Sequence, residues 1–202
     1  EWQQPAMPWE QSQLWCGRFN NLGELQERKI LIGNLADSIS SRSVFQPIWL
    51  ETGELLVAED SSGWWNLMKI DPHFDSALAP AYRTISPMEA EFAMPQWVYG
   101  MSTTSVSGEQ IISLRCKEGR WGIALLNHEE LITELDQPFD DLAGLSVQRD
   151  RIVAIASNPL TEPGLLELDL SAGTFIHTPP RESVLLEDQV SIPEPFWFEG
   201  FG

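Results

Sequence analysis

The stretch SVFQPIWLETGELLVAEDSSGWWNLMKID, residues 43–71, decides the fold of this chain. It divides into three apolar runs that are separated by turn residues at Thr52-Gly53 and at 61–63. Short runs rich in aromatic and branched side chains, bounded by Gly and Ser, are typical of β-strands joined by tight turns. A three-stranded unit of this size cannot cover both of its faces, so its meaning depends on whether the pattern repeats.

Similar runs recur along the chain at a regular distance. Equivalent points of the predicted first strands lie 48 residues apart in each case, at Trp49, Trp97 and Leu145. The predicted third strands end 56 residues apart at Ile70 and Leu126, and the next such end follows after 42. Four short strands in a period of about fifty residues predict β-propeller blades, whose radial packing covers the sheet faces. A double-sheet sandwich is the alternative, although sandwiches rarely keep a sequence period.

The predicted fold is therefore all-β, a partial β-propeller over residues 1–182. We expect part of one blade followed by three four-stranded blades, over residues 1–36, 43–86, 95–136 and 142–180. Residues 183–202, with two prolines and three aromatic side chains in PEPFWF, predict an exit strand and linker rather than another blade. Because an incomplete ring leaves an open sheet edge, we expect the chain to be a fragment of a larger protein.

Charge and apolar patterning limit the partners. Thirty acidic residues against twelve basic ones give a formal charge of −18, which repels phosphate backbones and excludes nucleic acid as a partner. No apolar run is long enough to span a membrane, and nothing at the start resembles a signal peptide. Cys16 and Cys116 lack metal-type spacing, so we expect two reduced thiols and a cytoplasmic location, with a structural disulfide as the alternative.

The sequence contains none of the common catalytic motifs. There is no G-x-S-x-G, no P-loop and no G-x-G-x-x-G. The histidines His73, His128 and His177 lie far apart beside predicted turns, which supports neither a triad nor a metal site. We therefore predict no cofactor, no metal and no catalytic activity for this chain by itself.

One acidic pair is placed where a propeller could contact a ligand. Glu89 and Glu91 lie in MEAEF, in the connection that leads into a predicted first strand. Paired carboxylates can hold a substrate's amino terminus, although thirty acids produce such pairs readily on a solvated surface. Nine tryptophans suggest ligand stacking, but four fall at repeat positions within predicted strands, where we expect them in the core: Trp49, Trp65, Trp97 and Trp121.

Residues 43–71, MEAEFAMPQWVYGMST (88–103) and EGRWGIALL (118–126) together resemble the propeller portion of bacterial prolyl-oligopeptidase-family serine peptidases. The similarity is greatest to the branch called dipeptidyl aminopeptidase or acylaminoacyl-peptidase, in particular to cyanobacterial-type members. AMPWEQSQLW (6–15) resembles the preceding blade, and VSIPEPFWFEG (190–200) resembles the junction with the catalytic domain.

The resemblance implies a propeller that caps a C-terminal α/β-hydrolase domain and limits access to peptides of modest size. The Ser-Asp-His triad of that domain has no matching motif here, so this chain would be the non-catalytic part that filters peptides. Its implied partners are peptide substrates and its own hydrolase domain, and Glu89 or Glu91 would hold a substrate amino group. A free-standing propeller, similar to the periplasmic TolB propeller and used for protein interaction, is the alternative.

Overall fold

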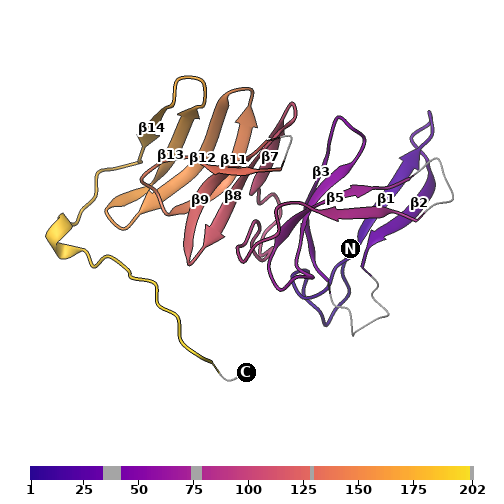
Figure 1. The fold of residues 1–202 in the computed structure, drawn as a ribbon, viewed down its shortest axis with the longest axis horizontal. Coiled ribbons are helices and arrows are strands. Elements are labelled where there is room, and N and C mark those ends of the chain that lie inside the picture. The colour runs from indigo at the N-terminus through magenta and orange to yellow at the C-terminus, as the bar shows by residue number, and fades with distance from the viewer. Residues whose placement is uncertain (34–41, 74–78, 128–129, 201–202) are drawn as a thin grey trace. The chain divides into compact units, whose positions relative to one another are not determined.

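The protein is described by a computed structural model, which covers residues 1–33, 42–73, 79–127 and 130–200. The described residues form antiparallel β-sheets and one short 3-10 helix (Figure 1). By its internal contacts the chain divides into two compact units. The first comprises Glu1–Met101 and Asn127–Ile132, and the second comprises Ser102–Leu126 and Thr133–Gly202.

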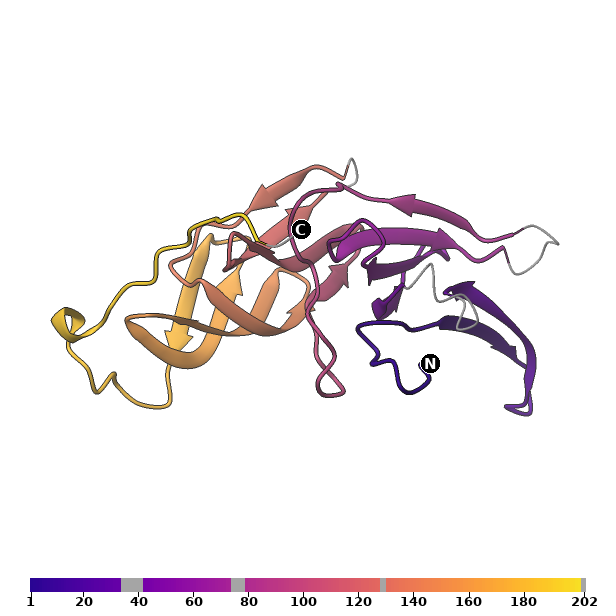
Figure 2. The ribbon, with the colours of Figure 1, turned by 90° about the horizontal axis from the view of Figure 1, so that it is seen from below.

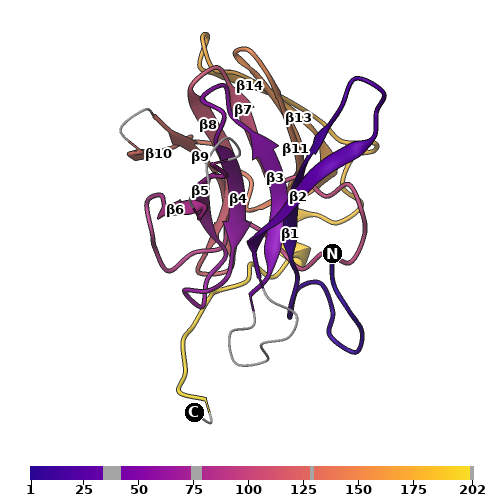
Figure 3. The ribbon, with the colours of Figure 1, turned by 90° about the vertical axis from the view of Figure 1, so that its right-hand side faces the viewer.

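The first unit contains a two-stranded and a four-stranded sheet. The two-stranded sheet pairs β1 (Leu14–Phe19) with β2 (Leu25–Ile32). The four-stranded sheet follows the chain order, as Figure 3 shows: β3 (Val44–Trp49), β4 (Leu55–Glu59), β5 (Asn66–Asp71) and β6 (Ala81–Thr84). Every residue of β4 is buried, because this strand lies inside the sheet and is covered on both faces.

The second unit is built from two further four-stranded sheets, again with sequential antiparallel pairing. The first contains β7 (Thr104–Ser107), β8 (Gln110–Lys117), β9 (Arg120–Leu126) and β10 (Ile132–Glu134). The second contains β11 (Asp141–Gln148), β12 (Arg151–Asn158), β13 (Thr161–Asp169) and β14 (Thr174–Thr178). Such sequential four-stranded sheets are the blades of a propeller.

Each unit buries its apolar side chains between its two sheets. In the second unit one cluster joins strands of both sheets through Ile112, Leu114, Ile123, Leu142, Leu145, Ile152 and Leu166. In the first unit the equivalent cluster joins β1 and β2 to the four-stranded sheet through Leu31, Ile32, Val44, Leu55, Val57, Met68 and Ile70. A single blade could not bury these faces alone, so packing of successive blades supplies the hydrophobic stabilisation.

These sheets confirm the all-β, partial-propeller prediction. The prediction of an exit strand was wrong for the part of 183–202 that is described. After β14 the chain runs to residue 200 without a strand, and its only regular element is η1 (Glu187–Gln189), as the yellow trace in Figure 2 shows. The side chains from 181 to 200 are exposed apart from Val190, so nothing in this segment forms a core.

The tryptophan prediction was half right. Trp65 is buried and Trp121 is half-buried against the core of the second unit. Trp49 is 55% exposed, and Trp97 is 72% exposed. Trp97 lies in a turn region before β7 rather than in a first strand, so its equivalence to Trp49 was wrong.

Candidate functional site

The predicted pair Glu89 and Glu91 lies in the first connection, residues 85–93, which follows β6 in the first unit. This connection is held against the start of β5. The carboxylate Oε2 of Glu91 accepts a hydrogen bond from the backbone N–H of Trp65 at 2.7 Å. The backbone N–H of Phe92 donates to the carbonyl oxygen of Trp65, also at 2.7 Å.

The side chain of Asn66 fixes the same connection from the next position of β5. It is almost fully buried, with 1% of its surface exposed. Its Nδ2 donates to the carbonyl oxygens of Met88 at 3.0 Å and Ala90 at 3.4 Å, and its Oδ1 accepts from the N–H of Met88 at 2.8 Å. One buried amide therefore satisfies three backbone groups, which leaves little freedom for this part of the connection.

The structure gives the two predicted carboxylates different environments. Glu89 is exposed, whereas Glu91 is half-buried and already engaged by Trp65. Burial raises the pKa of the Glu91 carboxyl, the hydrogen bond from Trp65 opposes this, and the charge of Asp60 adds to the rise. Glu91 thus has a structural role in the connection, and Glu89 remains available to solvent and ligands.

The β8–β9 hairpin of the second unit is equivalent to the β4–β5 hairpin of the first unit but carries different side chains. Strand pairing aligns Leu55 and Ile70 of β4–β5 with Ile111 and Leu126 of β8–β9. Equivalent residues of the two hairpins therefore differ by 56 in number, and Trp65 corresponds to Trp121. As in the first unit, the tryptophan N–H bonds to the following connection, in this case to the backbone carbonyl oxygen of Asp140 at 2.9 Å.

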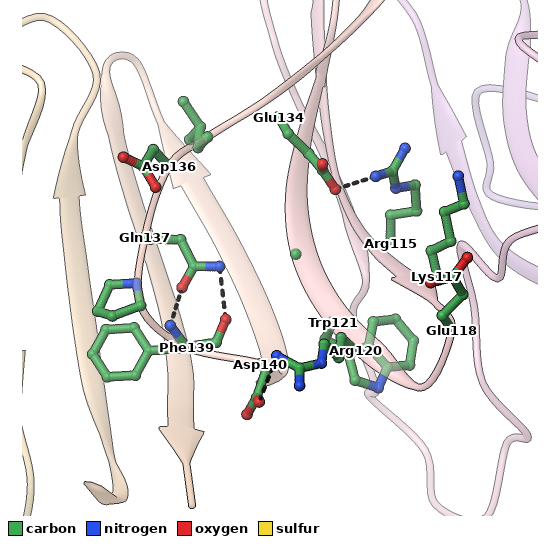
Figure 4. Close-up of a pocket in the computed structure, with 13 residues that line it drawn as sticks. Arg115, Lys117, Glu118, Arg120, Trp121, Glu134, Asp136, Gln137, Phe139 and Asp140 are labelled. Atoms are coloured by element: carbon green, nitrogen blue, oxygen red, sulfur yellow. Dashed lines mark hydrogen bonds and ion pairs between the residues drawn. The ribbon is translucent and has the colours of Figure 1, made fainter. Parts of the chain in front are cut away.

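A pocket opens beside this hairpin, between β8–β10 and the second connection, residues 135–140 (Figure 4). Its volume is about 650 Å³. Three basic side chains line it, Arg115, Lys117 and Arg120, together with the acids Glu118, Glu134, Asp136 and Asp140. Figure 4 shows Arg115 and Lys117 on the β8 side and Asp136 and Gln137 on the connection.

The charged groups around the pocket are partly paired. The guanidinium of Arg115 forms an ion pair with Glu134. Arg120 Nη1 lies 3.8 Å from Asp140 Oδ2, close to the limit for an ion pair. No ion pair of Lys117 occurs within the described part of the chain.

This pocket was not predicted from the sequence. One available signal was the spacing of Arg115, Lys117 and Arg120, which places three of the twelve basic residues within six positions of a strongly acidic chain. The other was the contrast between Trp65-Asn66 and Trp121-Gly122 at equivalent hairpin positions. Neither signal marks a ligand until the fold shows that these side chains share a pocket.

The histidines do not meet in a common site among the described residues. His73 Nδ1 lies 3.1 Å from Asp71 Oδ2. His177 is half-buried, its ring lies 4.5 Å from that of Phe139, and its Nε2 is 2.9 Å from the carbonyl oxygen of Ala156. His128 lies outside the described residues. Within the described ranges no cluster of His, Cys, Asp or Glu has the arrangement of a metal site.

Comparison with solved structures identifies the architecture. Puromycin hydrolase is 28% identical over 90% of this chain, with a TM-score of 0.77. The chain has the fold of a peptidase propeller. A puromycin-hydrolyzing peptidase of Mycobacterium tuberculosis matches 88% of the chain at 24% identity and a TM-score of 0.77. Prolyl oligopeptidase B from Galerina marginata matches 90% of it at 13% identity and a TM-score of 0.67.

The matched region is a minor part of each of these enzymes. The chain spans 27% of puromycin hydrolase, 26% of the mycobacterial peptidase and 24% of prolyl oligopeptidase B. No family model matches the sequence, and no curated protein matches it. Among the described residues there is no helix of the length and apolarity that crossing a bilayer requires.

Proposed function

We propose that this chain is the propeller segment of a prolyl-oligopeptidase-family serine peptidase, of the dipeptidyl aminopeptidase or acylaminoacyl-peptidase branch. In this proposal the chain performs no chemistry and filters peptides on their way to a hydrolase domain outside residues 1–202. The observation that carries it is the match to puromycin hydrolase, which extends over 90% of this chain but only 27% of that enzyme. Cys16 and Cys116 form no disulfide in the described part of the chain, which supports a reducing, cytoplasmic environment.

The packing of the blades supports a filtering role. Each unit joins its two sheets through a continuous apolar cluster, so the blades form stiff walls. A stiff wall admits an extended peptide and excludes a folded domain, without chemical recognition of every substrate. A propeller that selects substrates by size needs no catalytic nucleophile of its own.

The first experiment separates a peptidase from a free-standing interaction module. The complete protein that contains this chain should be labelled by a fluorophosphonate, which reacts with activated serines, and residues 1–202 by themselves should not be. Labelling of residues 1–202 would contradict the assignment of a non-catalytic segment. Absence of labelling of the complete, folded protein would contradict the peptidase assignment and favour an interaction propeller.

We also propose that Glu89 and Glu91 help to hold a substrate's amino group in the complete enzyme. Glu89 supports this because its carboxylate is exposed, and Glu91 lies two residues away in the same connection. Glu89→Gln should lower kcat/KM for a peptide with a free amino terminus and leave its acetylated counterpart unchanged. Glu91→Gln should do the same to a smaller extent, because this carboxylate also binds the Trp65 N–H. Wild-type kinetics in both variants would remove the pair from the site.

A further inference from the structure

The strand pairing of a blade does not require the three basic residues that line the second-unit pocket. The β4–β5 hairpin of the first unit is the sister hairpin of β8–β9. At the positions of Arg115, Lys117 and Arg120 it carries Glu59, Ser61 and Trp64. The sister hairpin therefore forms the same pair of strands with no basic residue at any of these three positions. The strand pair of a blade can thus form without a positive charge at these positions.

The three cations lie on one face of the sheet. Arg115 and Lys117 are two residues apart on β8, so their side chains point to the same side. Lys117 lies directly opposite Arg120 across the β8–β9 ladder. Like charges in directly opposite positions destabilise a strand pair. The hairpin thus contains a local electrostatic penalty that a bound anion would relieve.

Intramolecular acids relieve this penalty only in part. Glu134 pairs with Arg115, and Asp140 reaches Arg120 at the long distance of 3.8 Å. Lys117 is exposed, and the described residues provide no carboxylate for an ion pair with it. Within the described ranges, Lys117 is therefore a cation without an ion-pair partner at the rim of the pocket, although Glu118 and Asp136 also line this pocket and the chain carries a net charge of −18.

Gly122 provides the space for the pocket. It occupies the position of the buried Asn66 in the sister hairpin. A Cβ atom at Gly122 would lie 3.1 Å from Glu134 Oε1, so the missing side chain gives room to this carboxylate. The resulting volume of about 650 Å³ is in the range of small-ligand pockets.

We propose that the pocket lined by Arg115, Lys117 and Arg120 binds the carboxylate of a peptide. Arginine and lysine donors pair with carboxylates through charge-assisted hydrogen bonds. The identity of the anion as part of a peptide rests on the proposed function. The binding of a carboxylate does not, because it rests on Lys117, which has no ion pair among the described residues, on the two neighbouring arginines and on the free space beside them.

The test is a titration of residues 1–202 with acetyl-Ala-Ala-Ala, which has one carboxylate and no amino group, at low ionic strength. Its C-terminal amide serves as the neutral control, and backbone amide shifts in two-dimensional NMR report the site. The free acid should shift the resonances of Lys117 and Arg120 in a saturable way, and the amide should not. Equal binding of acid and amide, or no saturable shift at these residues, would overturn the proposal.

Two variants assign the binding to the pocket. Lys117→Ser introduces the residue of the sister hairpin and should weaken the affinity about fivefold or more through loss of a charged contact. Gly122→Asn fills the floor with the sister side chain and should reduce binding without abolishing the dispersed NMR spectrum of the fold. Arg149→Gln removes an equal charge from the exposed β11–β12 turn and should leave the affinity within about twofold.

Inorganic phosphate distinguishes a peptide site from a general anion site. The tripeptide acid should bind more tightly than phosphate, because the half-buried Trp121 also lines the pocket and offers apolar surface. Phosphate binding that equals or exceeds tripeptide binding would contradict the peptide assignment. Since these titrations need no hydrolase domain, their failure is independent of the fluorophosphonate result on the complete protein.

Discussion

The two connections between blades, residues 85–93 and residues 135–140, carry out the same task with different groups. The first contacts Trp65 through the Glu91 side chain and is secured by the buried Asn66. The second contacts Trp121 through the backbone carbonyl of Asp140, and the position of Asn66 is taken by Gly122. One connection is held tightly against its hairpin, and the other leaves a pocket.

The same position is thus used differently in the two blades, because Asn66 holds its connection through hydrogen bonds and Gly122 leaves room beside its own. In the first unit, Asn66 of β5 fixes the connection, and the Glu91 carboxylate is held by the Trp65 N–H as part of the structure. In the second unit, Gly122 takes the position of Asn66, and the charged side chains of Lys117 and Arg120 remain exposed to solvent. The sister blade therefore serves as an internal control for each substitution, because it shows which residues the hairpin accepts.

The largest effect is expected for Asn66→Gly, which gives the first hairpin the residue of the second. It removes three hydrogen bonds to backbone groups of the partly buried Met88 and the buried Ala90, so the free energy of unfolding of the first unit should fall by about 3 kcal/mol. Urea denaturation followed by tryptophan fluorescence measures this loss. A change below about 0.5 kcal/mol would show that Asn66 does not secure the connection.

A smaller loss is expected for Glu91→Ala, which removes the acceptor of the Trp65 N–H. The free energy of unfolding should fall by about 1–2 kcal/mol, whereas Glu91→Gln keeps an acceptor and should cost less than half as much. Equal losses in the two variants would contradict the capping role of the Glu91 oxygen.

The pH dependence provides an independent test of the Glu91 environment. Burial, together with the charge of Asp60, places the pKa of Glu91 above its ordinary value of 4.5 in the folded protein. Its contribution to stability is therefore fully present in acid and is lost as the pH rises through the raised pKa. Glu91→Gln should remove this part of the slope in denaturation curves recorded above pH 4.5. An unchanged slope would contradict the assignment.

The smallest effect is expected for Glu130→Gln in the first unit. Burial acts to raise the pKa of the Glu130 carboxyl, but bonds from Arg83 and Lys69 outweigh it and lower the pKa. This contribution is present above the ordinary value of 4.5 and is lost as the pH falls through the lowered pKa. The variant should cost less than about 1 kcal/mol at neutral pH, and added salt should reduce the loss. A loss that is independent of salt would rule out an ion-pair origin.

The strands could be predicted from the sequence because they depend on local alternation and turn residues. Residues 43–71 show this most clearly, since the predicted runs coincide with β3, β4 and β5. Trp97 was misplaced because an aromatic run resembles a strand in any local pattern. In the structure its ring lies 4.3 Å from that of Trp9, and the neighbouring Gln96 donates to the Val44 carbonyl at 2.8 Å. These partners are distant in sequence and leave no local signal.

The candidate sites were predictable to different degrees. Glu89 and Glu91 could be singled out because two acids stand out in a short connection, and their binding of a ligand stays a prediction. The hydrogen bond from the Trp65 N–H to Glu91 depends on the path of the chain and could not be predicted. The pocket near Lys117 was missed because it arises from an absent side chain at Gly122. The missing side chain at Gly122 is recognised only when the strand register of the second unit is aligned with that of the first, where Asn66 takes this position.

The proposed role of this propeller segment, to limit access to a peptidase active site, is tested most directly by substrate size. The complete protein should be assayed with a short peptide and with the same cleavage sequence held in a loop of a small folded protein. A filter predicts that kcat/KM for the folded substrate is lower by about tenfold or more, and that unfolding this substrate restores cleavage, because an extended chain is admitted. Equal kcat/KM values for the short peptide and the folded substrate would contradict the account.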